Sequence, residues 1–178
     1  DRPMTDITAI SQAGEWVSFG HNTAGTSYVT TNDPDLKGTL KWVEKIGEPI
    51  SGGAVSYKNR LFVVAADKYL VSLDQETGRT LWRTELPTPS SATPLVADDL
   101  VFIGTAGSSV FAFDAQNGEV IWDKSLGEGI LRSVALSDGV LYVTGINGIL
   151  FALDAGSGEL RWQRDMGNGI RGAPAIHE

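Results

Sequence analysis

The residues with the most suggestive chemistry in this chain are three aspartates at a constant spacing. Asp74, Asp114 and Asp154 lie 40 residues apart, and carboxylates are ligands that calcium prefers. Each aspartate, however, begins a short polar stretch that ends in glycine four residues later. Such an aspartate accepts backbone N–H groups of the residues that follow, and the glycine allows a left-handed backbone. We therefore interpret the three aspartates as turn-forming residues rather than as a metal site.

Residues for nucleophilic, metal or phosphate chemistry are scarce. The chain contains no cysteine, and His21 and His177 are its two histidines. This composition excludes disulfides, thiolate zinc sites, cysteine nucleophiles and a multi-histidine metal site within one chain. The Gly-x-Gly strings at 127–129 and 167–169 precede no helical pattern, so they predict no phosphate-binding loop. We predict neither a catalytic residue nor a metal ligand, and no cofactor.

Charge and hydropathy exclude two further classes of function. The net charge is −8 and the pI is about 4.7, so the chain lacks the basic character of proteins that bind nucleic acids or anionic membranes. The longest apolar run, residues 61–66, is far shorter than the roughly 20 residues of a transmembrane helix. No signal peptide is evident in the first residues, as expected of a mature exported protein, a cytosolic protein or a shortened chain.

A repeat of 40 residues dominates the sequence. Tryptophan recurs at this interval in four repeats and a turn glycine in three, and no insertion shifts the register between the first and the last tryptophan. Internal repeats of this length indicate an architecture built from one small unit. The structural columns of the repeat are Trp42, Trp82, Trp122 and Trp162; Asp74, Asp114 and Asp154; and Gly78, Gly118 and Gly158.

Each repeat unit has the pattern of about four short strands. Runs such as 61–64 are rich in aromatic and β-branched residues, and Phe111 and Phe113 alternate with the small Ala112. A four-stranded unit of roughly 40 residues is typical of a β-propeller blade. We therefore predict an all-β fold with propeller blades of four antiparallel strands. Each tryptophan is expected on an outer strand, covering the seam to the next blade, with its indole N–H bonded to a carbonyl.

The motif within the repeat resembles that of a known family. The strings 112–122 and 152–162 read Ala-x-Asp-x-x-(Asn or Ser)-Gly-x-x-x-Trp, and 72–82 differs by Ser72 at the first position. This pattern resembles the tryptophan-docking motif of the PQQ-like (quinoprotein) β-propeller repeat. Residues 16–22 also resemble the opening segment of such proteins, so the resemblance extends over nearly the whole chain. A WD40 assignment is poor, because no repeat carries the matching Gly-His.

The resemblance implies one of two kinds of protein. One comprises dehydrogenases that bind pyrroloquinoline quinone (PQQ) with calcium, typically with a vicinal cysteine disulfide and long insertions between blades. The other is a noncatalytic, BamB-like branch of interaction modules. The chain has neither cysteine nor insertions, so enzymatic activity is left uncertain, with the balance against it. We expect a noncatalytic interaction or scaffold module with a protein partner, located in the periplasm, on the cell surface or outside the cell.

Two other functions stay open at this stage. The chain could be the N-terminal part of a PQQ- and calcium-dependent alcohol or sugar dehydrogenase, whose ligands would come largely from a further part of that protein. It could instead be the extracellular sensor domain of a signalling protein.

The repeats divide the chain into an N-terminal extension, 1–37, and a propeller region, 38–178. Whole blades are predicted at about 53–83, 93–123 and 133–163. Parts of a further blade flank them, so the predicted ring is incomplete.

The flanking pieces are an outer strand at 39–46 and an inner strand at 172–177. Three explanations are open. The chain could be a fragment of a longer one, or another chain or copy could close the ring. Alternatively, residues 16–31 could form a hairpin that supplies the missing middle strands of a four-bladed ring.

Loops at one end of the blades are where the sequence departs from its repeat. Propellers bind ligands and partners through such loops, which join successive blades or the two middle strands of a blade. Arg132 and Arg171 stand out, because they are cations in an acidic chain and could hold a carboxylate. The residues predicted to form a partner or ligand face are Glu48, Asp67, Lys68, Glu128, Arg132, Asn147, Asn168 and Arg171.

Overall fold

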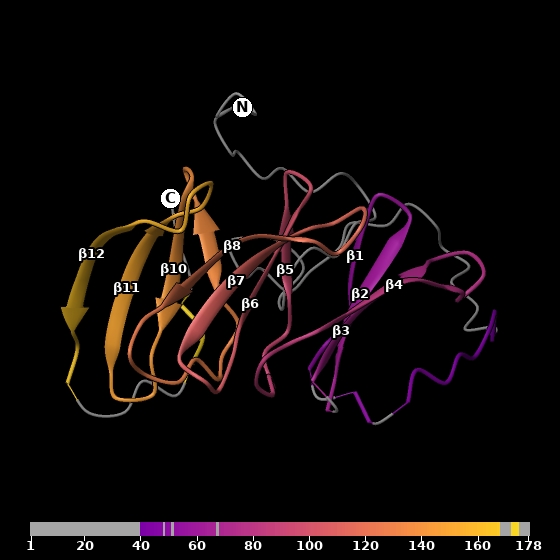
Figure 1. The fold of residues 1–178 in the computed structure, drawn as a ribbon, viewed down its shortest axis with the longest axis horizontal. Coiled ribbons are helices and arrows are strands. Elements are labelled where there is room, and N and C mark those ends of the chain that lie inside the picture. Colours follow the sequence, from indigo (N-terminus) through magenta and orange to yellow (C-terminus); the bar gives the residue numbers. More distant parts are fainter. Residues whose placement is uncertain (1–39, 48, 51, 67, 168–171, 175–178) are drawn as a thin grey trace, which may run out of the picture.

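The chain forms three four-stranded antiparallel sheets, each of which we call a blade. The computed structural model describes residues 40–47, 49–50, 52–66, 68–167 and 172–174, and these include no helix. The blades stand side by side in chain order, from right to left in Figure 1. The predicted all-β class and the 40-residue blade repeat are confirmed.

The strands run in simple sequence order within each blade, from the innermost to the outermost. Blade 1 contains β1 (Val55–Tyr57), β2 (Arg60–Ala65), β3 (Tyr69–Asp74) and β4 (Thr80–Glu85). Blade 2 contains β5 (Leu95–Ala97), β6 (Leu100–Gly104), β7 (Ser109–Asp114) and β8 (Val120–Ser125). Blade 3 contains β9 (Ala135–Ser137), β10 (Val140–Thr144), β11 (Ile149–Asp154) and β12 (Leu160–Asp165).

Apolar side chains fill the two seams between the blades. Phe62 of blade 1 and Phe113 of blade 2 belong to one buried cluster, and Phe102 of blade 2 and Phe151 of blade 3 belong to another. Full burial of such side chains is the main stabilising contribution of the fold. A lone blade would expose both of its faces, so each blade depends on its neighbours for burial.

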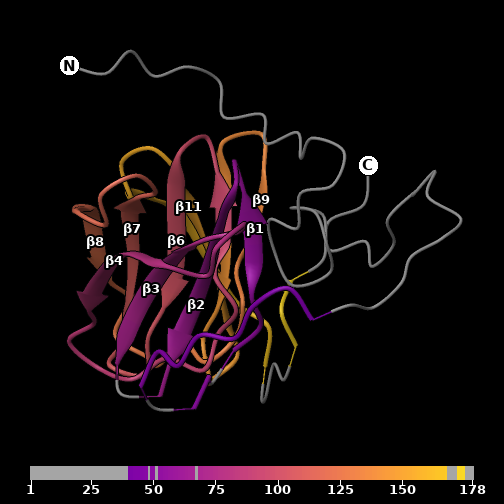
Figure 2. The same cartoon turned by 90° about the vertical axis from the view of Figure 1, so that its right-hand side faces the viewer.

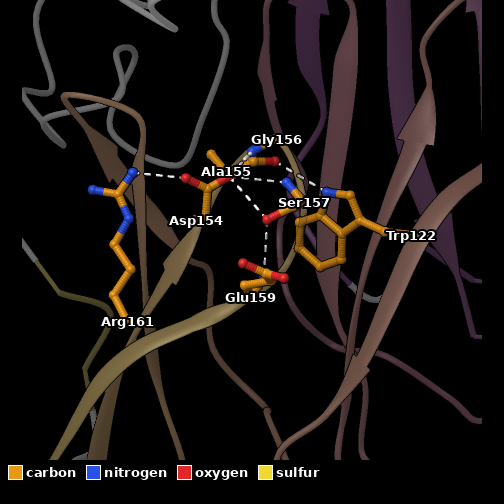
Figure 3. A network of polar contacts seen from close by, with 7 residues as sticks. All are labelled: Trp122, Asp154, Ala155, Gly156, Ser157, Glu159 and Arg161. Carbon is orange, nitrogen blue, oxygen red and sulfur yellow. Dashed lines mark hydrogen bonds and ion pairs between the residues drawn. The ribbon is translucent and has the colours of Figure 1, made fainter. Parts of the chain in front are cut away.

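Tryptophan docking repeats at every described seam. The indole Nε1 of Trp82 donates to the Ala115 carbonyl at 3.1 Å, and that of Trp122 donates to the Ala155 carbonyl at 3.0 Å. Figure 3 shows the second of these bonds beside the turn that begins at Asp154. The ring of Trp122 lies against Gly158, where a Cβ would come within 2.6 Å of it. This close approach explains why the turn ends in glycine.

The segment 40–47 docks on blade 1 in the same way. Trp42 Nε1 donates to the Gln75 carbonyl at 3.0 Å, and its ring covers Gly78. This segment was predicted as part of an outer strand, but it forms no strand. The reason is that no described strand lies beside it to complete a ladder. In Figure 2 it crosses the near side of the blade that contains β2 and β3.

The other end of the predicted ring is described only in part. Residues 172–174 are not in a strand, although the Gly172 carbonyl accepts a hydrogen bond from Thr144 Oγ1 at 3.2 Å. Residues 175–178, the extension 1–37 and the proposed hairpin 16–31 lie outside the described residues. The explanation that uses this hairpin therefore stays a prediction.

Candidate functional site

The loops that join successive blades lie at the same end of the molecule as the loops between the middle strands. We call this end the loop face; it is the end toward which β12 points in Figure 1. Its described loops are 86–94 and 126–134 between blades, and 105–108 and 145–148 within blades 2 and 3. Backbone hydrogen bonds connect the two kinds of loop, for example from the Ile146 N–H to the Gly129 carbonyl at 3.0 Å.

Glu128 fastens these loops together rather than facing solvent. Its side chain is 5% exposed, and Oε2 accepts the backbone N–H of Asn147 at 2.6 Å. The carboxyl lies on Gly145, where any Cβ would clash with it at 2.1 Å. Thr88, one repeat earlier, makes the same bond to the Gly107 N–H at 2.9 Å. The structure therefore gives this predicted face residue an anchoring role beneath the surface.

Arg132 is exposed on the loop face. No ion pair of Arg132 is present within the part of the chain that the structure describes. Two apolar side chains in the same pair of loops are also exposed: Leu131 at 38% and Ile146 at 48%. Hydrogen bonds join both loops to their neighbours: the Leu131 carbonyl accepts one from Ser91 Oγ at 3.4 Å, and the Ile146 N–H donates one to the Gly129 carbonyl at 3.0 Å.

The sequence-based prediction of this face missed Leu131 and Ile146, because it selected charged and polar loop residues. Ile146 stands at the repeat position that carries Ala66 in blade 1 and Ala106 in blade 2. Leu131 stands at the repeat position that carries Ser91 one repeat earlier. The repeat thus tolerates small residues at both places. Large apolar side chains at loop positions where the other repeats have small residues could have indicated a binding surface from the sequence.

The remaining residues predicted for this face differ in their exposure and in whether the structure describes them. Asn147 is exposed beside the Glu128 anchor, and Lys68 is half-buried with a left-handed backbone (φ 70°) in the blade 1 loop. Glu48, Asp67, Asn168 and Arg171 lie outside the described residues. The structure therefore brings Glu128 and Asn147 into contact, with Arg132 exposed in the same inter-blade loop as Glu128.

The aspartate column forms turns, at the opposite end of the blades. Oδ1 of Asp154 accepts the N–H groups of Gly156 and Ser157, both at 3.0 Å, and Arg161 pairs with its other oxygen at 2.7 Å (Figure 3). The Arg161 guanidinium, aided by the Ser157 donors, holds the pKa of Asp154 below its ordinary value. The Thr77 hydroxyl and N–H lower the pKa of Asp74 in the same way.

No candidate metal centre emerges from the described residues. Among them, no three His, Cys, Asp or Glu side chains converge closely enough to hold an ion. The described part of the chain also contains no helix with the length and hydropathy to cross a bilayer.

Comparison with known proteins places this geometry in a family. Residues 25–129 and 106–178 match the family described as "Outer membrane protein assembly factor BamB". The chain belongs to this family. Among curated protein sequences, none matches the chain significantly.

Solved structures show the same fold over most of the chain. BamB from Moraxella catarrhalis is 26% identical with a TM-score of 0.71, covering 79% of this chain and 45% of its own. This chain therefore spans less than half the length of that protein. Quinohemoprotein alcohol dehydrogenase from Comamonas testosteroni is 17% identical with a TM-score of 0.72, covering 86% of this chain and 27% of its own.

A designed protein shares the fold at nearly the same length. The computationally designed Ika4 protein is 19% identical with a TM-score of 0.71, covering 80% of this chain and 89% of its own. At these identities the alcohol dehydrogenase and Ika4 are informative for fold alone.

Proposed function

We propose that this BamB-family propeller is a noncatalytic interaction module that acts outside the cytoplasm and binds a protein partner through the loop face of blade 3. The observation that carries the proposal is the exposed set Leu131, Arg132 and Ile146. These residues replace small ones of the repeat and are not required by the blade framework.

The chemistry of this surface suits a protein partner. Leu131 and Ile146 offer apolar contact, and Arg132 offers a guanidinium for a partner carboxylate. The Glu128 anchor and the Ile146–Gly129 backbone bond hold the loops in place before binding, which reduces the entropy lost on association. The surrounding chain is acidic, so a local cation also favours one orientation of the partner.

Site-specific photocrosslinking in the native host tests this proposal. A photoreactive amino acid replaces Ile146 in the native protein, with Asp138, an exposed turn residue at the other end of blade 3, as the matched control position. We expect a discrete protein adduct from position 146, absent from position 138 and lost when Arg132→Glu is added. Equal adducts from both positions would contradict the proposal.

A second assay separates this function from that of a dehydrogenase. The purified native protein is incubated with PQQ and calcium and assayed for dye-coupled oxidation of alcohols. We expect no oxidation above the rate without protein. Turnover that requires PQQ would instead support the dehydrogenase alternative.

A further inference from the structure

Asparagine is followed by glycine at three places in this chain: 117–118, 147–148 and 168–169. In such a pair the backbone nitrogen of the glycine can attack the side-chain amide of the asparagine, which leads to deamidation. Glycine favours this reaction because it has no Cβ to crowd the five-membered ring that forms. The structure describes the first two pairs and surrounds them differently.

The side chain of Asn117 is fully engaged in the turn of blade 2. Its Oδ1 accepts the Glu119 N–H and its Nδ2 donates to Glu119 Oε2, both at 3.0 Å. The nitrogen that follows, that of Gly118, donates to the Asp114 carbonyl at 2.9 Å, and this glycine lies against the Trp82 ring. The fold therefore restrains both groups that would have to react.

The side chain of Asn147 is exposed in the loop 145–148. Within the described residues, no hydrogen bond engages its amide group, because the 2.6 Å bond to Glu128 Oε2 uses the backbone N–H. The Gly148 N–H donates to the Gly145 carbonyl at 3.2 Å, a longer bond than the one that holds the Gly118 nitrogen. The amide of Asn147 is thus free to turn toward the nitrogen that follows it.

We propose that Asn147 is a modification site, at which deamidation converts the side chain to aspartate or isoaspartate. The Gly148 nitrogen loses its proton to the solvent and attacks Cγ of Asn147, and the side-chain nitrogen leaves as ammonia. Water then opens the cyclic imide. Opening at Cγ gives aspartate, whereas opening at the main-chain carbonyl gives isoaspartate, whose backbone passes through the former side chain. The net reaction consumes water and releases ammonia.

Either product changes the loop face at its anchor. A carboxylate at position 147 adds negative charge to the residue whose backbone N–H the buried Glu128 carboxylate holds, and like charges this close repel. Isoaspartate also lengthens the backbone of the loop 145–148, whose Ile146 N–H bonds to the Gly129 carbonyl. Deamidation should therefore weaken partner binding by this face. That consequence rests on the proposed function, whereas the chemical conversion does not.

Peptide mapping by mass spectrometry, after the native protein has been aged at mildly alkaline pH, tests the conversion. The three pairs lie in three different tryptic peptides, so each is followed separately, against an unaged sample digested in parallel. We expect Asn147 to convert roughly tenfold faster than Asn117, because losing one or two hydrogen bonds costs about this factor in rate. Equal rates, faster conversion at Asn117 or an unmodified Asn147 would overturn the proposal.

Two variants at exposed positions show whether the structure causes this difference. Asn147→Gln keeps an amide but requires a larger ring for the same attack, so position 147 should stay unmodified. Glu119→Ala removes the acceptor of Asn117 Nδ2, so it should speed conversion of Asn117 severalfold and leave the rate at Asn147 unchanged. An unchanged rate at Asn117 in this variant would overturn the explanation.

Photocrosslinking from position 146 tests the effect on binding. Asn147→Asp, which carries the charge of the modified residue, should give a severalfold weaker adduct than Asn147→Gln. Equal adducts from the two variants would overturn the effect on binding. If position 146 gave no adduct even with Asn147 intact, the proposed function would fail, and the mass-spectrometric result would still decide whether Asn147 is a modification site.

Discussion

At the residue scale, blade 1 contains a hydroxyl that its fold does not use. Ser72 is completely buried, and its Oγ has no hydrogen-bond partner within the described chain. The column continues as Ala112 and Ala152. A buried polar atom without a partner has lost its hydrogen bonds to water and forms none within the protein, which lowers stability.

Replacement of this serine should therefore stabilise the protein. We expect Ser72→Ala to raise the free energy of unfolding by about 1 kcal/mol, because the methyl group fits where the other blades already have one. Urea denaturation measures the change. The reciprocal Ala112→Ser should lower stability by a similar amount, and a stabilising effect of that variant would contradict the explanation.

The turn carboxylate of blade 3 should make stability depend on pH. The pKa of Asp154 is lowered in the folded state, first by Arg161 and then by the Ser157 donors. Its contribution is therefore present above the unfolded pKa of about 3.9 and is lost as the pH falls through the lower folded value.

Asp154→Asn should consequently be less stable than the wild type at neutral pH, with a difference that shrinks in strong acid. Urea denaturation at neutral pH and below about pH 3 measures both ends of this range. Arg161→Gln removes the main cause of the shift, so its pH dependence should be weaker than that of the wild type. An Asp154→Asn deficit that stays constant across this range would contradict the assignment.

At the scale of elements, the outer strands differ in what covers them. Trp122 on β8 is 9% exposed because blade 3 lies over it, whereas Trp162 on β12 is 44% exposed. Both indoles pack on an aromatic ring of their own blade, with centroids 6.0 Å apart. Each tryptophan thus makes the equivalent ring contact within its own blade. In the described chain, Trp122 is also covered by a neighbouring blade, whereas Trp162 is largely uncovered.

This difference makes a matched pair of substitutions. Trp122→Phe should lower the free energy of unfolding by about 2 kcal/mol, through the lost bond to the Ala155 carbonyl and the lost ring area. Trp162→Phe should lower it by less than about 0.5 kcal/mol, as expected of exposed sites. Thermal or urea unfolding of the two variants checks the contrast, and equal losses would show that docking contributes little.

The sequence predicted those features that repeat and missed those that depend on departures from the repeat. Turn aspartates and docked tryptophans recur in register, so their columns alone indicated blades and seams. The burial of Glu128 depends on the missing Cβ of Gly145, which lies in a loop of the next blade. Periodicity carries no information about such local pairings.

At the scale of the whole molecule, blade 2 is the one blade with a complete neighbouring blade on both sides in the described chain. Its middle strands β6 and β7 are almost entirely buried, whereas every residue of β12 is exposed. Local opening is rarest where both faces of an element are covered.

Hydrogen exchange should follow this order. We expect amides in 100–114 to exchange most slowly and those in 160–165 to exchange much faster, although both segments lie in antiparallel sheets. Exchange measured by mass spectrometry on peptides from the three blades would show it. Uniform protection across the blades would mean that the molecule opens as a single cooperative unit.

The docked tryptophans also bear on how the chain folds as it is made. Each indole bonds to a carbonyl 33 residues further along the chain. A blade that has just emerged during synthesis therefore cannot complete its own seam until the next turn has been added. Structure would then spread by nearest-neighbour steps, as in a one-dimensional array. The most recently synthesised blade would always expose an uncovered indole. This end of the growing chain would therefore be the part most prone to nonspecific hydrophobic association.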